Sequence, residues 1–135
     1  MKRTQARESI FILVFESSFN TDSSLEEIYK LAIDTEVIED DEYIYSTFCG
    51  CVEKDDELNQ KISGSAVGWK TQRMSKISLA IMKVALYEML YVDDVPFAVA
   101  INEALELAKK YDHDSAPSFI NGILNNIAEK EGLKN

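Results

Sequence analysis

Residues that interrupt helices are scarce: the 135-residue chain has only five glycines and two prolines. Apolar residues recur at helical spacing along most of its length. No useful stretch alternates between apolar and polar residues, as a half-buried strand would. The sequence therefore predicts an all-α fold.

Residues that carry chemistry are equally few. His113 is the only histidine, and the two cysteines, Cys49 and Cys51, form a C-x-C pair. This spacing fits neither a thioredoxin-type pair nor a structural zinc set, so we interpret both as thiols buried on a helix. The sequence also has no G-x-S-x-G motif and no glycine-rich phosphate loop. We expect no catalytic centre, no metal site and no cofactor.

Long apolar runs are missing as well. No uncharged apolar run reaches the roughly 18 residues that a membrane-spanning helix needs. The N-terminus has cations but no small-residue cleavage site, and Glu16 interrupts its apolar stretch. These features predict a cytoplasmic protein without a membrane segment, whose 135 residues form a single domain.

Positive charge is outnumbered, with 14 basic against 24 acidic side chains and a net charge of -10. This balance argues against coating nucleic acid through bulk electrostatics. Two segments differ from the rest. Residues 1–7 carry three cations and no acid, and residues 58–87 have no acid but five cations, Lys61, Lys70, Arg73, Lys76 and Lys83. On charge alone, a binding role and a merely solvated surface remain equally open for residues 58–87.

Helix signals divide the chain into segments. We expect helices over residues of about 4–19, 40–52 and beyond, 74–92, 93–112 and 115–132. A further helix should begin after the capping box that Ser24 and Glu27 form. The segment SGSAVGW predicts a hinge near residue 66, between halves of about 1–65 and 66–135. Gly122, inside the last helix, suggests close approach of another helix.

Three blocks of the sequence resemble the NusB family of transcription antitermination factors. VPFAVAINEALELAKKYD and SFINGILNNI are similar to its C-terminal signature, approximately D-x-P-x-x-V-A-I-N-E-A-x-E-L-A-K followed by F-x-N-G-x-L. WKTQRMSKISLAIMKVALYEML resembles its W…R…I-L-R-x-A-x-Y-E-L segment, and KRTQARESIFILVFE resembles its arginine-rich start. The resemblance spans the whole chain and is weakest over residues 20–65.

The resemblance implies two small helical bundles packed into one compact domain. It also implies binding of boxA, a short single-stranded element of nascent RNA, together with the ribosomal protein NusE in the RNA polymerase antitermination complex. By matched position, the RNA-binding residues would be Lys2, Arg3, Thr4 and Arg7. Phe119 opens the F-x-N-G block and would lie near the RNA, where it can stack on a base.

Elementary electrostatics supports an anion-binding role for the N-terminal cations independently of the resemblance. Cations near a helix N-terminus oppose the helix dipole, and Arg3 and Arg7, spaced i and i+4, also repel each other. A phosphate would favour both, because helix N–H groups and cations suit an anion. Position alone favours a core role for Phe119, whereas the resemblance favours a partly exposed stacking role.

Two departures from the family pattern stand out. Thr4 and Gln5 separate the basic positions, where the family often has adjacent arginines. Lys83 replaces an arginine, which keeps the charge and loses the bidentate fork, so we expect a structural or partner-facing role for it.

Other functional hypotheses stay open. One is a helical protein-interaction module without RNA binding, including a homodimer that hides the basic face. Another is an enzyme fragment, because RNA cytosine methyltransferases carry a NusB-like N-terminal domain. The chain ends at Asn135 without a nucleotide-binding segment, so we expect no enzymatic activity.

Overall fold

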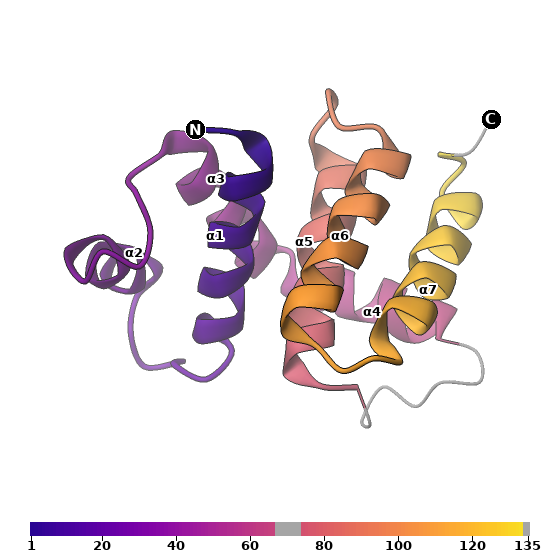
Figure 1. Cartoon of the computed structure of the whole chain (residues 1–135), viewed down its shortest axis with the longest axis horizontal. Coiled ribbons are helices and arrows are strands. Elements are labelled where there is room, and N and C mark those ends of the chain that lie inside the picture. The colour runs from indigo at the N-terminus through magenta and orange to yellow at the C-terminus, as the bar shows by residue number, and fades with distance from the viewer. Residues whose placement is uncertain (67–73, 134–135) are drawn as a thin grey trace.

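The computed structural model describes residues 1–66 and 74–133 of the chain. Within these residues the fold is all-α, as predicted, and no strand is present (Figure 1). The helices are α1 (Arg3–Ser17), α2 (Leu25–Asp34), α3 (Glu42–Glu53), α4 (Asp55–Ser65), α5 (Lys76–Tyr91), α6 (Phe97–Tyr111) and α7 (Ala116–Lys130).

Side-chain caps fix where several helices begin. The predicted capping box of α2 is present: the Glu27 N–H donates to Ser24 Oγ at 3.1 Å, and Glu27 Oε1 accepts from the Ser24 N–H at 3.0 Å. Asp41 Oδ1 caps α3 by accepting from the Ile44 N–H at 3.1 Å. Such caps satisfy backbone donors that the first turn of a helix leaves without partners.

The helices form two bundles side by side (Figure 1). In the first, α1 packs against α2 and α3, and in the second, α4, α5, α6 and α7 pack together. The expected continuation of the third helix is wrong, because the helix ends at Glu53 and α4 begins after Lys54. Since α4 packs on α5 and α7, the spatial division falls at Lys54 and not near residue 66. Trp69, Lys70 and Arg73 lie outside the described residues.

The core is continuous across the two bundles, because α1 and α3 both pack against α5. Helices α3 and α5 approach closely at Gly50, because an added Cβ there would lie 2.2 Å from Tyr87 Oη. The prediction for Gly122 is wrong, since that residue is exposed and a Cβ there would meet nothing within 4 Å. Among the described residues, the largest fully buried side chains are those of Phe48, Ile10, Leu13, Ile28, Ile44, Leu58, Ile62, Ile81, Met82, Leu86, Ile120 and Ile123.

Both cysteines lie on a helix, as predicted, but only one of them is buried. Cys51 is buried on α3 and Cys49 is half-buried on the same helix. Burial raises the pKa of the Cys51 thiol, which disfavours the reactive thiolate. In the part of the chain that the structure describes, no cluster of histidine, cysteine and carboxylate side chains could hold a metal ion. None of the described helices combines the length and apolar character needed to cross a bilayer.

Candidate nucleic-acid interface

The N-terminal tip of α1, which we define as Lys2, Arg3 and Thr4, is exposed. Lys2 occupies the N-cap position, and the first turn of the helix contains no acidic residue. The Arg3 side chain retains 39% exposure. The tip therefore presents two cations beside the N–H groups of a helix terminus, an arrangement that suits a phosphate.

Arg3 rests on an aromatic ring from the neighbouring helix. Its Cζ lies 3.8 Å from the centroid of the Tyr43 ring in α3, within the range of a cation–π contact. Its Nη2 also lies 3.8 Å from Asp94 Oδ2, in an ion pair whose acidic partner is 73% exposed. Exposed ion pairs contribute about 0–1 kcal/mol, so this one competes weakly with a ligand.

Arg7 is in a different environment, although it lies one helical turn further along α1. Its side chain is only 6% exposed. Its Nε donates to Glu88 Oε1 at 2.7 Å, and its Nη1 donates to Glu103 Oε1 at 2.9 Å. The expectation that Arg7 faces an external phosphate is therefore wrong for this structure, because two carboxylates of the same chain bind its guanidinium.

These contacts belong to a network that joins four helices. Glu88 in α5 is fully buried, and its Oε2 accepts a hydrogen bond from Tyr43 Oη in α3. Glu103 in α6 accepts a second bond from Thr4 Oγ1, at 2.5 Å. Burial, and then the bond to Glu88, raise the pKa of Tyr43, which keeps its hydroxyl a donor. Buried charges need such partners, and this network fixes α1 against both bundles.

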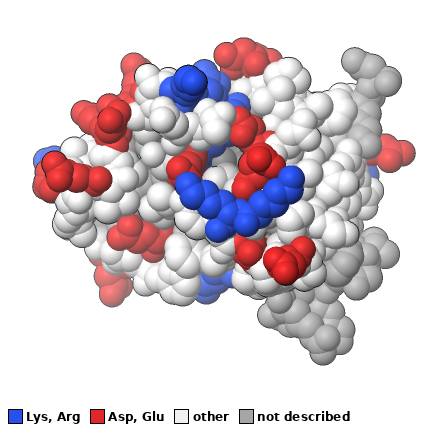
Figure 2. Space-filling view, viewed as in Figure 1, with Lys and Arg blue, Asp and Glu red and all other residues white. Residues whose placement is uncertain are grey.

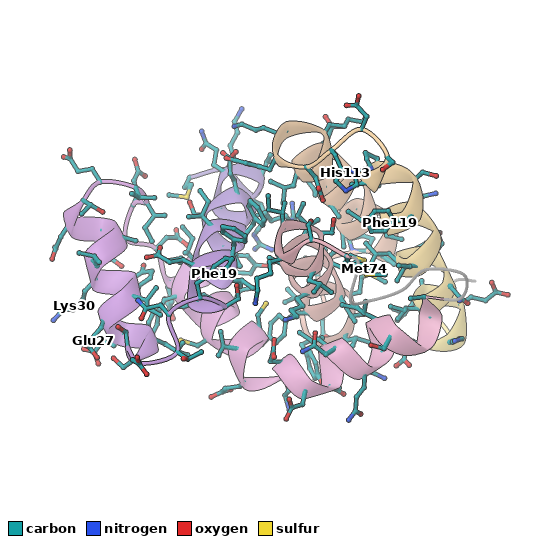
Figure 3. The ribbon with its side chains drawn as sticks, turned by 90° about the horizontal axis from the view of Figure 1, so that it is seen from below. Phe19, Glu27, Lys30, Met74, His113 and Phe119 are labelled. Atoms are coloured by element: carbon teal, nitrogen blue, oxygen red, sulfur yellow. The ribbon has the colours of Figure 1, made fainter. Side chains whose placement is uncertain are left out.

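Phe119 is part of the core, and the expected partly exposed stacking role is wrong. The residue is 7% exposed, near the start of α7. Its ring centroid lies 6.3 Å from that of His113, and the two side chains are neighbours in Figure 3. Helices α5 and α6 lie between α1 and α7 (Figure 1), so Phe119 does not adjoin the tip of α1. Its position in an amphipathic helix predicted the core correctly.

A groove of about 420 Å³ runs between α1 and α6, and sequence reasoning missed it. Thr4 and Gln5 line one side, and the exposed Lys109 and Lys110 line the other. Carboxylates interleave with these lysines: Lys110 Nζ lies 2.6 Å from Glu8 Oε2, and Lys109 Nζ lies 3.0 Å from Glu106 Oε2. Figure 2 shows blue and red side chains close together on this face, so no continuous basic surface extends from the tip.

Glu8 is held by the C-terminal end of α6. Its Oε2 accepts from Lys110 Nζ and from Tyr111 Oη, each at 2.6 Å. The bond from Lys110 is the main cause that lowers the pKa of the Glu8 carboxyl, and the bond from Tyr111 adds to it. The same pairing raises the pKa of Lys110.

The acid-free stretch over residues 58–87 is neutralised in part by acids from elsewhere. Lys61 Nζ lies 3.0 Å from Glu131 Oε2, and Lys83 Nζ lies 2.7 Å from Asp55 Oδ1. Lys76 Nζ lies 5.0 Å from the centroid of the exposed Phe19 ring. For Lys83, the 12% exposed side chain and its ion pair with Asp55 favour the structural one of the two roles expected for it.

One signal in the sequence could have revealed the buried network. Glu88 interrupts the apolar run VALYEML, and an acid on a buried helix stripe needs a cationic partner. Glu103 has a structural role, because it accepts bonds from Thr4 and from Arg7. Nothing in the spacing, however, indicates that Arg7 and not Arg3 is the partner of Glu88.

Comparison with known proteins identifies the family. The family model described as "NusB family" matches residues 4–129. The chain belongs to the NusB family. It is 40% identical over 130 residues to a transcription antitermination protein NusB from Acetivibrio thermocellus, covering 96% of this chain and 90% of the relative. It is also 40% identical over 131 residues to the NusB protein of Agathobacter rectalis, covering 95% and 100%.

Solved NusB structures have the same fold. The structure of T. maritima NusB superimposes with a TM-score of 0.82 at 29% identity, covering 96% of this chain and 92% of that chain. A structure of antitermination factors NusB and NusE in complex with double-stranded RNA gives a TM-score of 0.82 at 18% identity, covering 95% and 96%. The second likeness bears on fold alone.

Proposed function

We propose that this chain is a transcription antitermination factor that binds single-stranded boxA RNA in nascent transcripts together with NusE. It acts as an adaptor that helps the RNA polymerase antitermination complex to form, in the cytoplasm and without catalysis. Its membership of the NusB family supports this role, as do the relatives named as transcription antitermination proteins.

One observation carries the assignment of the RNA contact. The α1 tip presents Lys2 and Arg3 to solvent at a helix N-terminus whose first turn has no acid. Cations beside a helix N-terminus oppose the helix dipole in the free protein, and a bound anion would offset that cost. Lys2 and Arg3 would bind phosphates, while the exposed Thr4 would contact the backbone beside them.

The burial of Arg7 and Phe119 changes what we propose for them. Arg7 would act as a positioning residue, since its bonds to Glu88 and Glu103 hold α1 against α5 and α6. Phe119 would support the start of α7 from inside. Either residue would then affect RNA binding through the shape of the protein and not by direct contact.

A titration of labelled boxA RNA at several salt concentrations, with and without NusE, tests the proposal. For the double variant Lys2→Ala/Arg3→Ala, the slope of log K against log salt should fall by about 1.4, since each phosphate contact to a single strand contributes about 0.7. Lys30→Ala/Lys54→Ala removes two other exposed cations and is the matched control. An equal loss in both variants would show only a general charge effect.

The main alternative is a protein-interaction module without direct RNA contact. In that case NusE would bind the chain, but boxA RNA would not bind the chain alone. The α1 tip would also make no contact with RNA in the complex of the chain with NusE. A homodimer that hides the tip would appear in sedimentation equilibrium, and its dissociation constant would rise in the double variant. Either result would overturn the tip assignment.

A further inference from the structure

A second groove lies in the first bundle, between α2 and α3, and has a volume of about 870 Å³. Tyr29, Ile33 and Tyr45 form an aromatic and aliphatic part of its lining. The Tyr29 and Tyr45 ring centroids are 4.7 Å apart with the rings tilted by 59°. Because Tyr29 is buried, the half-buried Tyr45 supplies the aromatic surface that a ligand can reach.

Negative charge surrounds this surface. The groove is lined by one cation, Lys30, and by five carboxylates, those of Glu26, Asp34, Asp40, Asp41 and Glu42. Within the described part of the chain, none of these five acids takes part in an ion pair, whereas those of Glu8, Asp55, Glu88 and Glu103 all do. The five carboxylates therefore give the groove a net negative charge, which Lys30 offsets only in part.

The loop side of the groove is held in a defined shape. Tyr29 Oη donates to Asp40 Oδ1 at 2.7 Å and accepts from the Asp41 N–H at 2.8 Å. Asp41 Oδ1 in turn caps α3. Asp34 lies in the last turn of α2, where a carboxylate opposes the helix dipole, and this turn contains no basic residue. The charge of Asp34, like the cations at the α1 tip, opposes the dipole of its own helix.

The distribution of the carboxylates indicates the kind of ligand. The carboxylates do not suit a metal ion, because no cluster of histidine, cysteine and carboxylate side chains among the described residues could hold one. Nucleic acid is excluded by the sign of the charge. A ligand with several separated cations and planar groups fits both the carboxylates and the Tyr45 ring, and arginine side chains supply both features.

We propose that the α2–α3 groove binds an arginine-rich segment of a protein partner. Guanidinium groups pair with Glu26, Asp34 and Glu42 along the rim, and one stacks on the half-buried Tyr45 ring. The groove is lined only by residues of α2, of α3 and of the loop between them, and by none of α1. This site is independent of RNA binding.

The test uses a labelled dodecapeptide of alternating arginine and glycine, titrated against the full chain at moderate salt. The variant Glu26→Gln/Asp34→Asn/Glu42→Gln removes three rim charges and leaves the structural bonds of Asp40 and Asp41 in place. It should bind the peptide about tenfold more weakly, because exposed ion pairs contribute modestly but add up over several contacts. Circular dichroism should show unchanged helix content.

The matched control is Asp93→Asn/Asp114→Asn/Glu129→Gln, which neutralises three other exposed acids and gives the same net charge. Its affinity should change less than about twofold, since fields from distant surface charges are screened over about 8 Å. Equal losses in the two triple variants would overturn the proposal in favour of general charge attraction. Equally tight binding of spermine would also overturn it, in favour of a small polyamine.

A further variant tests the aromatic part of the groove. Tyr45→Leu keeps the apolar volume but removes the ring, so it should weaken binding of the arginine peptide more than that of a matched lysine peptide. Amide chemical-shift changes on peptide addition should map to α2 and α3. Changes confined to another face, or self-association of the chain that the rim variant abolishes, would contradict the assignment of a foreign partner.

Discussion

Arg3 and Arg7 lie one turn apart on the same helix, yet their environments have little in common. Arg3 remains 39% exposed, resting on the Tyr43 ring beside a weak surface ion pair. Arg7 is 6% exposed and binds two carboxylates. Spacing of i and i+4 places two side chains on one face of a helix, but the neighbours of that face change within a single turn.

The difference separates two roles that one stretch of positive charge can have. A buried arginine with two carboxylate partners organises the protein, whereas an exposed one at a helix N-terminus can meet a ligand. The two roles predict opposite patterns: loss of the first should change stability, and loss of the second should change only binding.

The largest effect is expected from Arg7→Ala. Removing the guanidinium leaves Glu88 buried without its cation, so the free energy of unfolding should fall by about 3–5 kcal/mol. Urea denaturation followed by circular dichroism measures this loss. Arg3→Ala is the matched control and should change the stability by no more than about 1 kcal/mol. Similar small losses in both variants would remove the distinction between the two arginines.

Phe119→Ala should be the next most damaging. The substitution leaves a cavity at the start of α7, so we expect a loss of about 3 kcal/mol, at the low end for a buried phenylalanine. Phe19, which is 62% exposed, provides the control, and Phe19→Ala should lose less than about 1 kcal/mol. A stable Phe119→Ala protein that had lost only RNA affinity would restore the stacking role.

Glu103→Gln tests the residue that contacts both the first turn of α1, through Thr4, and the next turn, through Arg7. Its Oε1 accepts from Thr4 and from Arg7, so losing the charge should cost about 1–2 kcal/mol while Glu88 still pairs with Arg7. Thermal or urea unfolding at pH 7 provides the measurement. Glu106→Gln, at an exposed position on the same helix, should have an effect within about 0.5 kcal/mol.

The smallest effect concerns Glu8, the residue after Arg7. Its pKa is lower in the folded protein than in the unfolded chain, so its pairing stabilises the fold above the unfolded pKa of about 4.5 and is lost as the pH falls through the folded value. The partly exposed position limits the contribution to a few tenths of a kcal/mol. In Glu8→Gln, unfolding free energies measured at pH 7 and pH 3 should differ less than in the parent chain. An unchanged difference would mean that the pairing with Lys110 adds nothing.

Much of the fold could be predicted because its determinants are local. The Ser24–Glu27 capping box, the position of Pro117 in the first turn of α7 and the apolar stripes all depend on residues within a few positions of each other. The break at Lys54 escaped prediction, since no glycine or proline marks it and α4 turns away to pack on α5 and α7. The candidate site was predicted only in part, because the exposure of Arg7 and Phe119 depends on distant segments.

By itself, the sequence determined that the chain is helical, that cations gather at its leading helix and that it resembles one family. Only the tertiary structure decided which of those cations faces solvent. The carboxylates that bury Arg7 come from positions 81 and 96 residues away, and folding alone brings them to α1. Periodicity along one helix defines a shared face, whereas burial depends on what the rest of the chain packs against that face.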